Sequence, residues 1–324
     1  MQILLANAKI MFEKADRKPF STPLFQSVAD ELAAEMARMD VKELAHQLDC
    51  SQKLAAENWL RYQNFPCAEK MPAILAYNGQ AYKHLRANTL SDKALMFAQE
   101  HLWITCFLYG LLRPMDGIVP YRMEHCVSME TTHDKPVNQY WKDKLTNQLI
   151  ESVKADDGML IHLSTEEYEH LFDWKRVCQE VRVIHPLFYV RQRDGRLKMQ
   201  AVWAKSCRGA MVRFMLQHQL VMPEELKAFS YEGFEYVPQL GEDDYPHFVR
   251  EYHRTCFSAY VKEKQKEGYL LDSGSNGQGS IYRSEYDAFL TGCHTPLSFF
   301  WGETNVGHPK YGVMFYRLLF LKRV

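Results

Sequence analysis

Short apolar runs and amphipathic stretches alternate along most of the chain. Four apolar runs predict short buried strands, at residues 1–6, 71–76, 104–109 and 159–163. Apolar side chains at three- to four-residue spacing predict helices over 22–39, 91–101 and 138–153. Thr22 followed by Pro23 is a suitable start for the first helix, and Ser91 for the second. We expect each helix to cover the strands with one face.

A hairpin followed by a helix is predicted in the second half. Residues 181–192 and 196–204 are rich in β-branched and aromatic side chains, and Arg-Asp-Gly at 193–195 supplies turn chemistry. A helix is expected over 205–219. Strands and helices are mixed without a strict strand–helix–strand rhythm, so the fold class is α+β or mixed α/β. We expect a central mixed sheet with surrounding helices.

Two short helices joined by a tight turn are predicted over 41–62. Asp40 is a suitable cap for the first, and residues 49–51 form the turn. The unit is helix–turn–helix, and its turn contains no glycine. Residues 30–70 hold eight acidic and five basic side chains, which is unfavourable for contact with DNA.

The chain of 324 residues divides at its composition shifts. Residues 1–250 are predicted to form the main domain, 251–271 a helical extension, and 272–280 a Gly/Ser-rich linker. Residues 281–324 form a C-terminal extension for which the sequence indicates no role. Eight cysteines without a Cys-x-x-Cys pair indicate a reducing compartment, and no stretch is long enough for a membrane span. A cytoplasmic location is therefore expected.

The 39 basic and 40 acidic residues leave a formal net charge of -1, but the charges are distributed unevenly along the chain. Residues 170–220 carry ten Lys/Arg and three acids, whereas 221–250 carry seven acids and two bases. The basic stretch predicts an anion-binding face. The alternative is that the acidic stretch folds back and neutralises it.

Two segments concentrate side chains that recognise anions. Residues 108–116 and 120–124 place arginines, a tyrosine and acids in an apolar loop, and the helix start at 204–214 places three basic residues on one side beside a glycine. The candidate anion contacts are Arg113, Tyr121, Arg122, Lys205, Arg208, Gly209 and Arg213. Arg113–Asp116 and Arg122–Glu124 ion pairs are the structural alternative.

These segments resemble motifs of the YaaA peroxide-stress protein family, over about residues 1–250. The family's LYGxLRPxD…PYRxE pattern matches 108–124, and AKxxRGxMxRF matches 204–214. The resemblance implies a cytoplasmic protein that limits iron-mediated oxidative damage and binds DNA through a helix-hairpin-helix and a basic cleft. Residues 41–62 are the best match to this helix-hairpin-helix-like element, although their turn lacks the glycine that lets backbone amides face a phosphate. The family's Ser-Pro-Ala-Lys is Ala6-Asn7-Ala8-Lys9 here, which keeps the lysine and loses the hydroxyl.

Two functions follow for the same residues. The first is sequence-independent binding of double-stranded DNA, to which the hairpin unit adds Lys53 and Arg61. The second is an enzyme acting on a small anionic substrate, with Lys9, Glu124 and Lys205 as catalytic candidates. No motif names a reaction class, and no cofactor is expected. Glu43/His46 and Glu167/His170 have metal-ligand spacing, but such pairs arise by chance at this composition, so no metal site is predicted.

Overall fold

The computed structural model describes residues 1–251, 269–271 and 321–323 and divides into two compact units, Met1–Tyr252 and His253–Val324. The described part of the second unit is an antiparallel pair of strands, β13 (Tyr269–Leu271) and β14 (Leu321–Arg323). The predicted linker over 272–280 lies outside the described residues, as do most of the predicted helical extension over 251–271 and of the C-terminal extension over 281–324.

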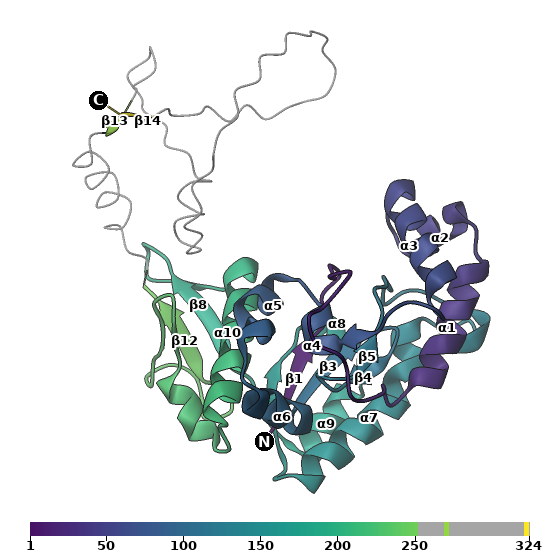
Figure 1. Ribbon diagram of the computed structural model, residues 1–324. Helices are drawn as coiled ribbons and strands as arrows, with labels where there is room; N and C mark the ends of the chain where they lie inside the picture. Colours follow the sequence, from purple (N-terminus) through teal and green to yellow (C-terminus); the bar gives the residue numbers. More distant parts are fainter. Residues whose placement is uncertain (252–268, 272–320, 324) are drawn as a thin grey trace. The chain divides into compact units, whose positions relative to one another are not determined.

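A five-stranded sheet forms the centre of the first unit (Figure 1), in the order β4-β3-β1-β6-β7. Its strands are β1 (Gln2–Ala6), β3 (Leu102–Cys106), β4 (Gly110–Leu112), β6 (Met159–Leu163) and β7 (Arg182–Ile184). β1 runs parallel to both β3 and β6, β6 is parallel to β7, and β4 is antiparallel to β3. The predicted mixed α/β class is confirmed.

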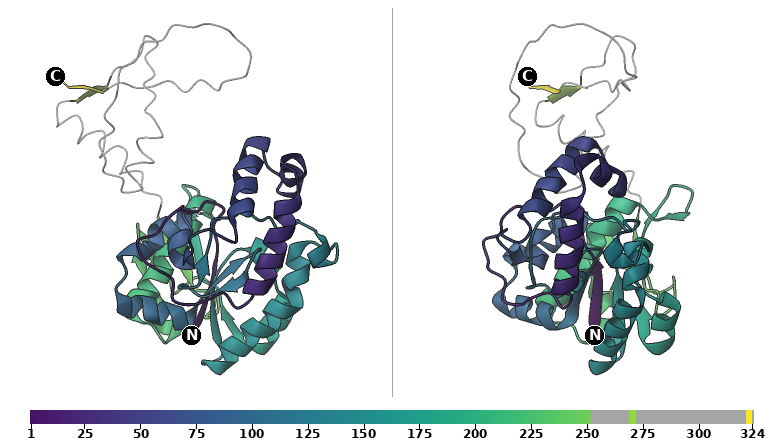
Figure 2. Two further views of the ribbon diagram at one scale, coloured as in Figure 1. Left: turned by 45° about the vertical axis from the view of Figure 1, so that its right-hand side comes forward. Right: turned by 90° about the vertical axis from the view of Figure 1, so that its right-hand side faces the viewer.

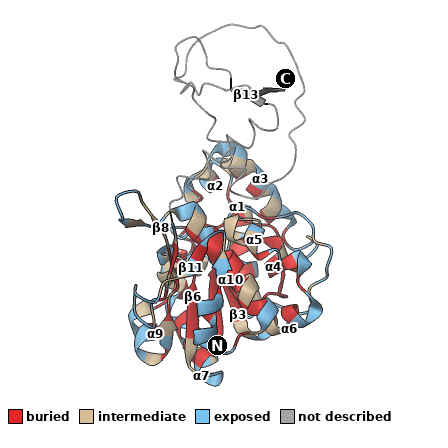
Figure 3. Ribbon diagram, turned by 90° about the vertical axis from the view of Figure 1, so that its left-hand side faces the viewer, coloured by how far each residue is buried: buried red, intermediate tan, exposed pale blue. Residues whose placement is uncertain are grey.

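Helices cover this sheet. α6 (Asp92–His101) leads directly into β3, and α7 (Val137–Ala155) packs on β4 and β6. α9 (Trp174–Glu180) contacts α7 and β7, and α8 (Glu166–Glu169) follows β6. Figure 3 shows buried residues along β3 and β6, with exposed residues on the outside of α7 and α9. Ser91 caps α6 as predicted, because its hydroxyl accepts the Ala94 amide at 3.2 Å.

A second five-stranded sheet has the order β10-β11-β12-β8-β9. Its strands are β8 (Leu187–Arg191), β9 (Leu197–Lys198), β10 (Ser230–Tyr231), β11 (Phe234–Tyr236) and β12 (His247–Arg250). α10 (Ala201–His218) packs against β8, α6 and α5 (Gln80–Leu85). Short 3₁₀ helices are formed by η1 (Ala87–Thr89), η2 (Glu130–Thr132) and η3 (Pro223–Ala228).

The predicted hairpin over 181–204 is wrong in its extent. Its first arm is broken at His185 and Pro186, so β7 pairs with the central sheet and β8 with the second sheet. The second arm has two paired residues, and α10 begins at Ala201 instead of residue 205. Proline lacks the amide that a continuous strand would need here.

Two other predicted elements differ at their starts. α1 (Gln26–Arg38) begins four residues after Thr22, and Phe25 at its cap position provides no side-chain hydrogen bond. The predicted strand over 71–76 is β2 (Met71–Pro72), paired with β5 (Gly117–Ile118), followed at once by α4 (Ala73–Ala76).

The predicted pair of short helices is present as α2 (Val41–Gln47) and α3 (Gln52–Asn64), which pack on each other. Asp40 accepts the Lys42 and Glu43 amides at 2.8 Å, and Ser51 accepts the Leu54 amide. Asp49 adopts the left-handed conformation, with φ 43°, at the turn. Both helices project beyond the carboxyl ends of the central strands in all three views (Figures 1 and 2).

Candidate functional site

At the carboxyl end of β1 the order of strands in the central sheet reverses. β3 lies on one side of β1 and β6 on the other. In open sheets with parallel strands, ligands bind in the crevice at such a switch point. A cavity of about 520 Å³ opens here, bordered by the residues that follow β1 and β6 and by the starts of α5 and α10. Three of the cations predicted from the sequence line it: Lys9, Lys205 and Arg208.

Arg208 is the unusual member of this lining. Its guanidinium is mostly buried, and its Nε has no hydrogen-bond partner among the residues that the structure describes. Among residues 1–251, no carboxylate lies within ion-pair distance of it. Burial lowers its pKa, although arginine remains protonated. Glu169 acts on Arg208 only beyond ion-pair distance and is itself paired with His162. A mostly buried cation in such surroundings is costly unless a ligand supplies the opposite charge at short range.

Lys9 and Lys205 lie closer to solvent on the same lining. Lys205 is exposed and forms no ion pair with the described part of the chain. Lys9 is 48% exposed, and its Nζ donates to Glu124 Oε2 at 2.7 Å. The lining also contains Glu166 and Glu167, so the cavity carries three cations and two acids. The positive charge is therefore concentrated toward Arg208 and α10.

Glu124 connects Lys9 to Arg122 beside the cavity. The carboxylate is 7% exposed, and its Oε1 lies 2.7 Å from the Arg122 guanidinium. The alternative Arg122–Glu124 ion pair is therefore present. Because the carboxylate is shared between two cations, it stabilises their positions.

Tyr121 is buried behind Lys9 in a hydrogen-bonded cluster. Its hydroxyl accepts the Asn7 amide at 3.2 Å and lies 2.8 Å from the Tyr77 hydroxyl. Burial raises the pKa of Tyr121 and Tyr77 well above the usual range, so both stay neutral. Burial likewise raises the pKa of the Cys106 thiol, to about 11. The cluster positions Asn7 at the end of β1.

Gly209 brings two helices into close contact. A Cβ at this position would lie 1.8 Å from the Ala81 carbonyl oxygen of α5. Gly79 has a similar role, because its Cβ would lie 2.5 Å from the Cβ of Ala8. The helical glycine therefore marks the approach of another backbone, which sets the width of the cavity between α5 and α10.

Two predicted anion contacts lie elsewhere. Arg113 is at the amino ends of β1 and β3, where its guanidinium donates to Gln2 Oε1 at 3.1 Å and to the Leu102 carbonyl at 3.2 Å. It also stacks 3.5 Å over the Trp103 ring. Arg213 donates to the Leu85 and Arg86 carbonyls at 3.0 Å, at the end of α5. The structure does not bring either side chain to the cavity at β1.

The cations of the helix pair are also apart from the cavity lining. Lys53 is exposed in the first turn of α3. Arg61 donates to Glu13 Oε1 at 2.6 Å and to Asn58 Oδ1 at 3.2 Å. Part of the basic stretch 170–220 is likewise neutralised, because Arg182 pairs with Asp244 at 2.8 Å and Arg191 with Glu251 at 2.9 Å.

One cluster has the composition of a metal site. Ligand atoms of Glu124, His125 and Glu167 lie within 4.8 Å of one another. Glu124 is already bound by Lys9 and Arg122, so a cation at this point would face two positive charges at short range. Glu167 is grouped with His125 and not with His170, the partner that its sequence spacing indicated.

A histidine pair near Arg208 was missed by the sequence analysis. His162 on β6 is 1% exposed, lies 4.5 Å from the His185 ring, and has its Nε2 2.8 Å from Glu169 Oε1. Burial lowers the pKa of His162 and, together with His162 and Arg208, lowers that of His185 to about 3. Single histidines at strand ends give no signal in the sequence, because only pairing across β6 and β7 brings them together.

Comparison with known proteins identifies relatives of the first unit. The family described as "Peroxide stress protein YaaA" matches residues 1–240. A UPF0246 protein of Bacteroides thetaiotaomicron is 41% identical over 247 residues, covering 75% of this chain and 96% of the relative. One from Parabacteroides distasonis is 39% identical over 255 residues (78% and 100%), and one from Legionella pneumophila is 33% identical over 259 residues (77% and 99%). In the described residues no helix is long and apolar enough to cross a membrane. The match over residues 1–240 and the identities of 33% to 41% show that the chain belongs to the YaaA peroxide-stress protein family.

Proposed function

We propose that this peroxide-stress protein limits iron-mediated oxidative damage in the cytoplasm by binding double-stranded DNA, independently of sequence, through the cavity at the end of β1. The observation that carries the proposal is Arg208, a mostly buried cation that forms no ion pair within the described residues. Lys9 and Lys205 on the same lining add two further cations for a phosphate group.

Backbone phosphates are the part of DNA that such a lining can bind. Point charges and a guanidinium recognise phosphate oxygens without reading base edges. Lys53 and Arg61 extend the contacts along α3, which projects on the same side of the sheet (Figure 1). Asp49 occupies the left-handed position of the α2–α3 turn, where its carboxylate would oppose a phosphate. The helix pair is therefore a secondary contact, and the cavity is the principal one.

The test is fluorescence-polarisation binding of a short random-sequence duplex across a salt series. Lys205→Glu changes an exposed side chain, and Arg208→Gln removes the buried charge while keeping much of the volume. Lys175→Glu, an exposed lysine of α9, is the matched control. Each lost phosphate contact should make the plot of log K against log salt shallower by about one unit.

Affinity should fall in both cavity variants and stay unchanged in the control. The proposal fails if the wild-type chain does not bind duplex at low salt, or if the two variants keep the wild-type affinity and slope. Circular dichroism of each variant distinguishes a lost contact from a lost fold.

A second function is favoured by the ion pair between Lys9 and Glu124. Lys9 lines the cavity, and a buried carboxylate holds its Nζ at 2.7 Å, which is an arrangement that an enzyme acting on a small anion could use. Lys9 and Lys205 are then the catalytic candidates. Calorimetric binding of inorganic pyrophosphate that depends on Arg208, together with no binding of duplex, would favour this function.

A further inference from the structure

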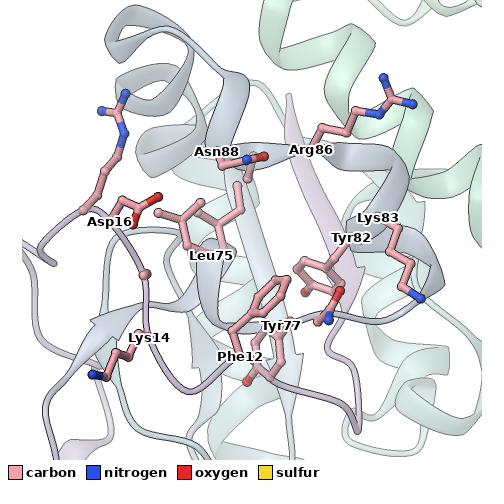
Figure 4. A pocket seen from close by; sticks show the side chains of 14 residues that line it. Phe12, Lys14, Asp16, Leu75, Tyr77, Tyr82, Lys83, Arg86 and Asn88 are labelled. Atoms are coloured by element: carbon pink, nitrogen blue, oxygen red, sulfur yellow. The ribbon is translucent and has the colours of Figure 1, made fainter. Parts of the chain in front are cut away.

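A second cavity, of about 390 Å³, lies between the loop after β1 and the segment around α4 and α5. Tyr82 borders both this cavity and the one at the end of β1. The loop is held at both ends: the Phe12 amide donates to the Ala76 carbonyl at 2.8 Å, and Arg17 pairs with Asp92. The residues between these points are therefore fixed over the cavity (Figure 4).

The cavity has an aromatic wall. Figure 4 shows Phe12 beside Tyr77 and Tyr82. The centroids of the two tyrosine rings lie 5.3 Å apart. Both tyrosine hydroxyls are engaged elsewhere, with Tyr121 and with the Ala6 carbonyl, so their carbon rings form the wall. Phe12 is 47% exposed, which leaves an aromatic face open to a ligand. Such a face favours the stacking of a planar ring.

Cations without acidic partners surround this wall. Lys14, Lys83 and Arg86 line the cavity, and none of them forms an ion pair within residues 1–251. The acid on the lining is Asp16. Burial and the charges of the neighbouring Arg86 and Lys83 lower the pKa of His84.

Stabilisation of the helix end does not account for this charge. Basic side chains at the end of a helix usually compensate its dipole. α5 has six residues, and Arg213 already donates to the Leu85 and Arg86 carbonyls there. Burial and repulsion from Arg86 lower the pKa of Arg213. Lys83 of α5 and Arg86, the residue at its C-cap, therefore remain without a neutralising ion pair in the described residues.

We propose that this cavity binds a nucleotide. The base stacks on Phe12, and the phosphate is held by Lys83 and Arg86. The side-chain amides of Asn78 and Asn88 have no hydrogen-bond partner in the described residues, and they line the same cavity, where they can contact the base edge or the ribose. The nucleotide is either free or part of a single strand, since both present the same chemistry.

The experiment titrates the full chain with adenosine 5′-monophosphate, with binding measured by calorimetry and contact with the base by saturation-transfer NMR. Lys83→Glu/Arg86→Glu should weaken binding at least tenfold, whereas the charge-matched control Lys175→Glu/Lys198→Glu on α9 and β9 should not. Phe12→Ala should weaken binding of the nucleotide about tenfold and leave binding of inorganic phosphate unchanged.

A short single-stranded oligonucleotide is the second arm. Stronger binding of the oligonucleotide, weakened by the same variants, supports a nucleotide within a strand, and equal affinities support a free nucleotide. The proposal is overturned if neither probe binds at millimolar concentration, or if binding is insensitive to Phe12 and Arg86. Lys205→Glu/Arg208→Gln should keep nucleotide binding, so failure of the DNA proposal remains distinguishable.

Discussion

Gly209→Ala tests whether the contact between α10 and α5 determines the stability of the fold and the shape of the cavity. The added Cβ would lie 1.8 Å from the Ala81 carbonyl oxygen and 2.9 Å from the Ala81 Cα. An ordinary contact needs more than 3 Å, so the helices must separate by more than 1 Å. Overpacking of this kind costs about 3 kcal/mol or more, against a gain of about 1 kcal/mol in helix propensity.

The net loss in unfolding free energy is therefore about 2 kcal/mol, which corresponds to a Tm lower by about 4–8 °C for a unit of this size. Urea unfolding and calorimetry measure it. Gly209→Ala/Ala81→Gly should not recover the loss, because the clash is with backbone. Unchanged or raised stability of Gly209→Ala would refute the reasoning, and recovery in the double variant would mean that side chains set the distance.

Three further predictions concern charged groups. Folded His185 stays neutral because its pKa is about 3, whereas in the unfolded chain it binds a proton below about pH 6.5. The free energy of unfolding should therefore decrease between pH 7 and pH 5. In urea titrations the decrease should be about 2 kcal/mol larger for the wild type than for His185→Gln. Arg113→Lys should lose about 2 kcal/mol of stability in urea, because it gives up guanidinium hydrogen bonds to Gln2 and Leu102 and the stacking on Trp103. It should leave duplex affinity unchanged. Glu124→Gln should cost about 3 kcal/mol and strengthen duplex binding in polarisation assays, because Lys9 loses its counter-charge.

These three predictions have separate failure conditions. Equal pH dependence of the wild type and His185→Gln would remove the histidine from the linkage. Weaker duplex binding by Arg113→Lys would return that arginine to the interface. Unchanged affinity of Glu124→Gln would mean that Lys9 does not contact the ligand.

Local features of the sequence predicted the elements that depend on neighbouring residues. Asp40 and Ser91 cap the helices expected from them, because a cap is formed within three residues. The strand at 159–163 was found from its apolar run alone. The break at His185 and Pro186 was missed, because it depends on pairing with β6 and β12, which lie far away in the chain.

The site was predicted in part, for the same physical reason. Lys205 and Arg208 share one side of a single helix, so their convergence follows from helical periodicity, and Lys9 joins them through the order of strands in the sheet. Arg113 and Arg213 have equally suggestive sequence surroundings, yet they bind carbonyl groups of distant segments. No periodicity shows which arginine finds such partners.

The Nε–H resonance of the Arg208 guanidinium in ¹⁵N NMR tests the central claim most directly. Within the described part of the chain, this nitrogen has no hydrogen-bond partner. The account predicts that the resonance shifts when duplex DNA is added at low salt and returns as salt is raised, while the resonance of Arg113 stays in place. A resonance of Arg208 that does not move while duplex binding is observed would contradict the account.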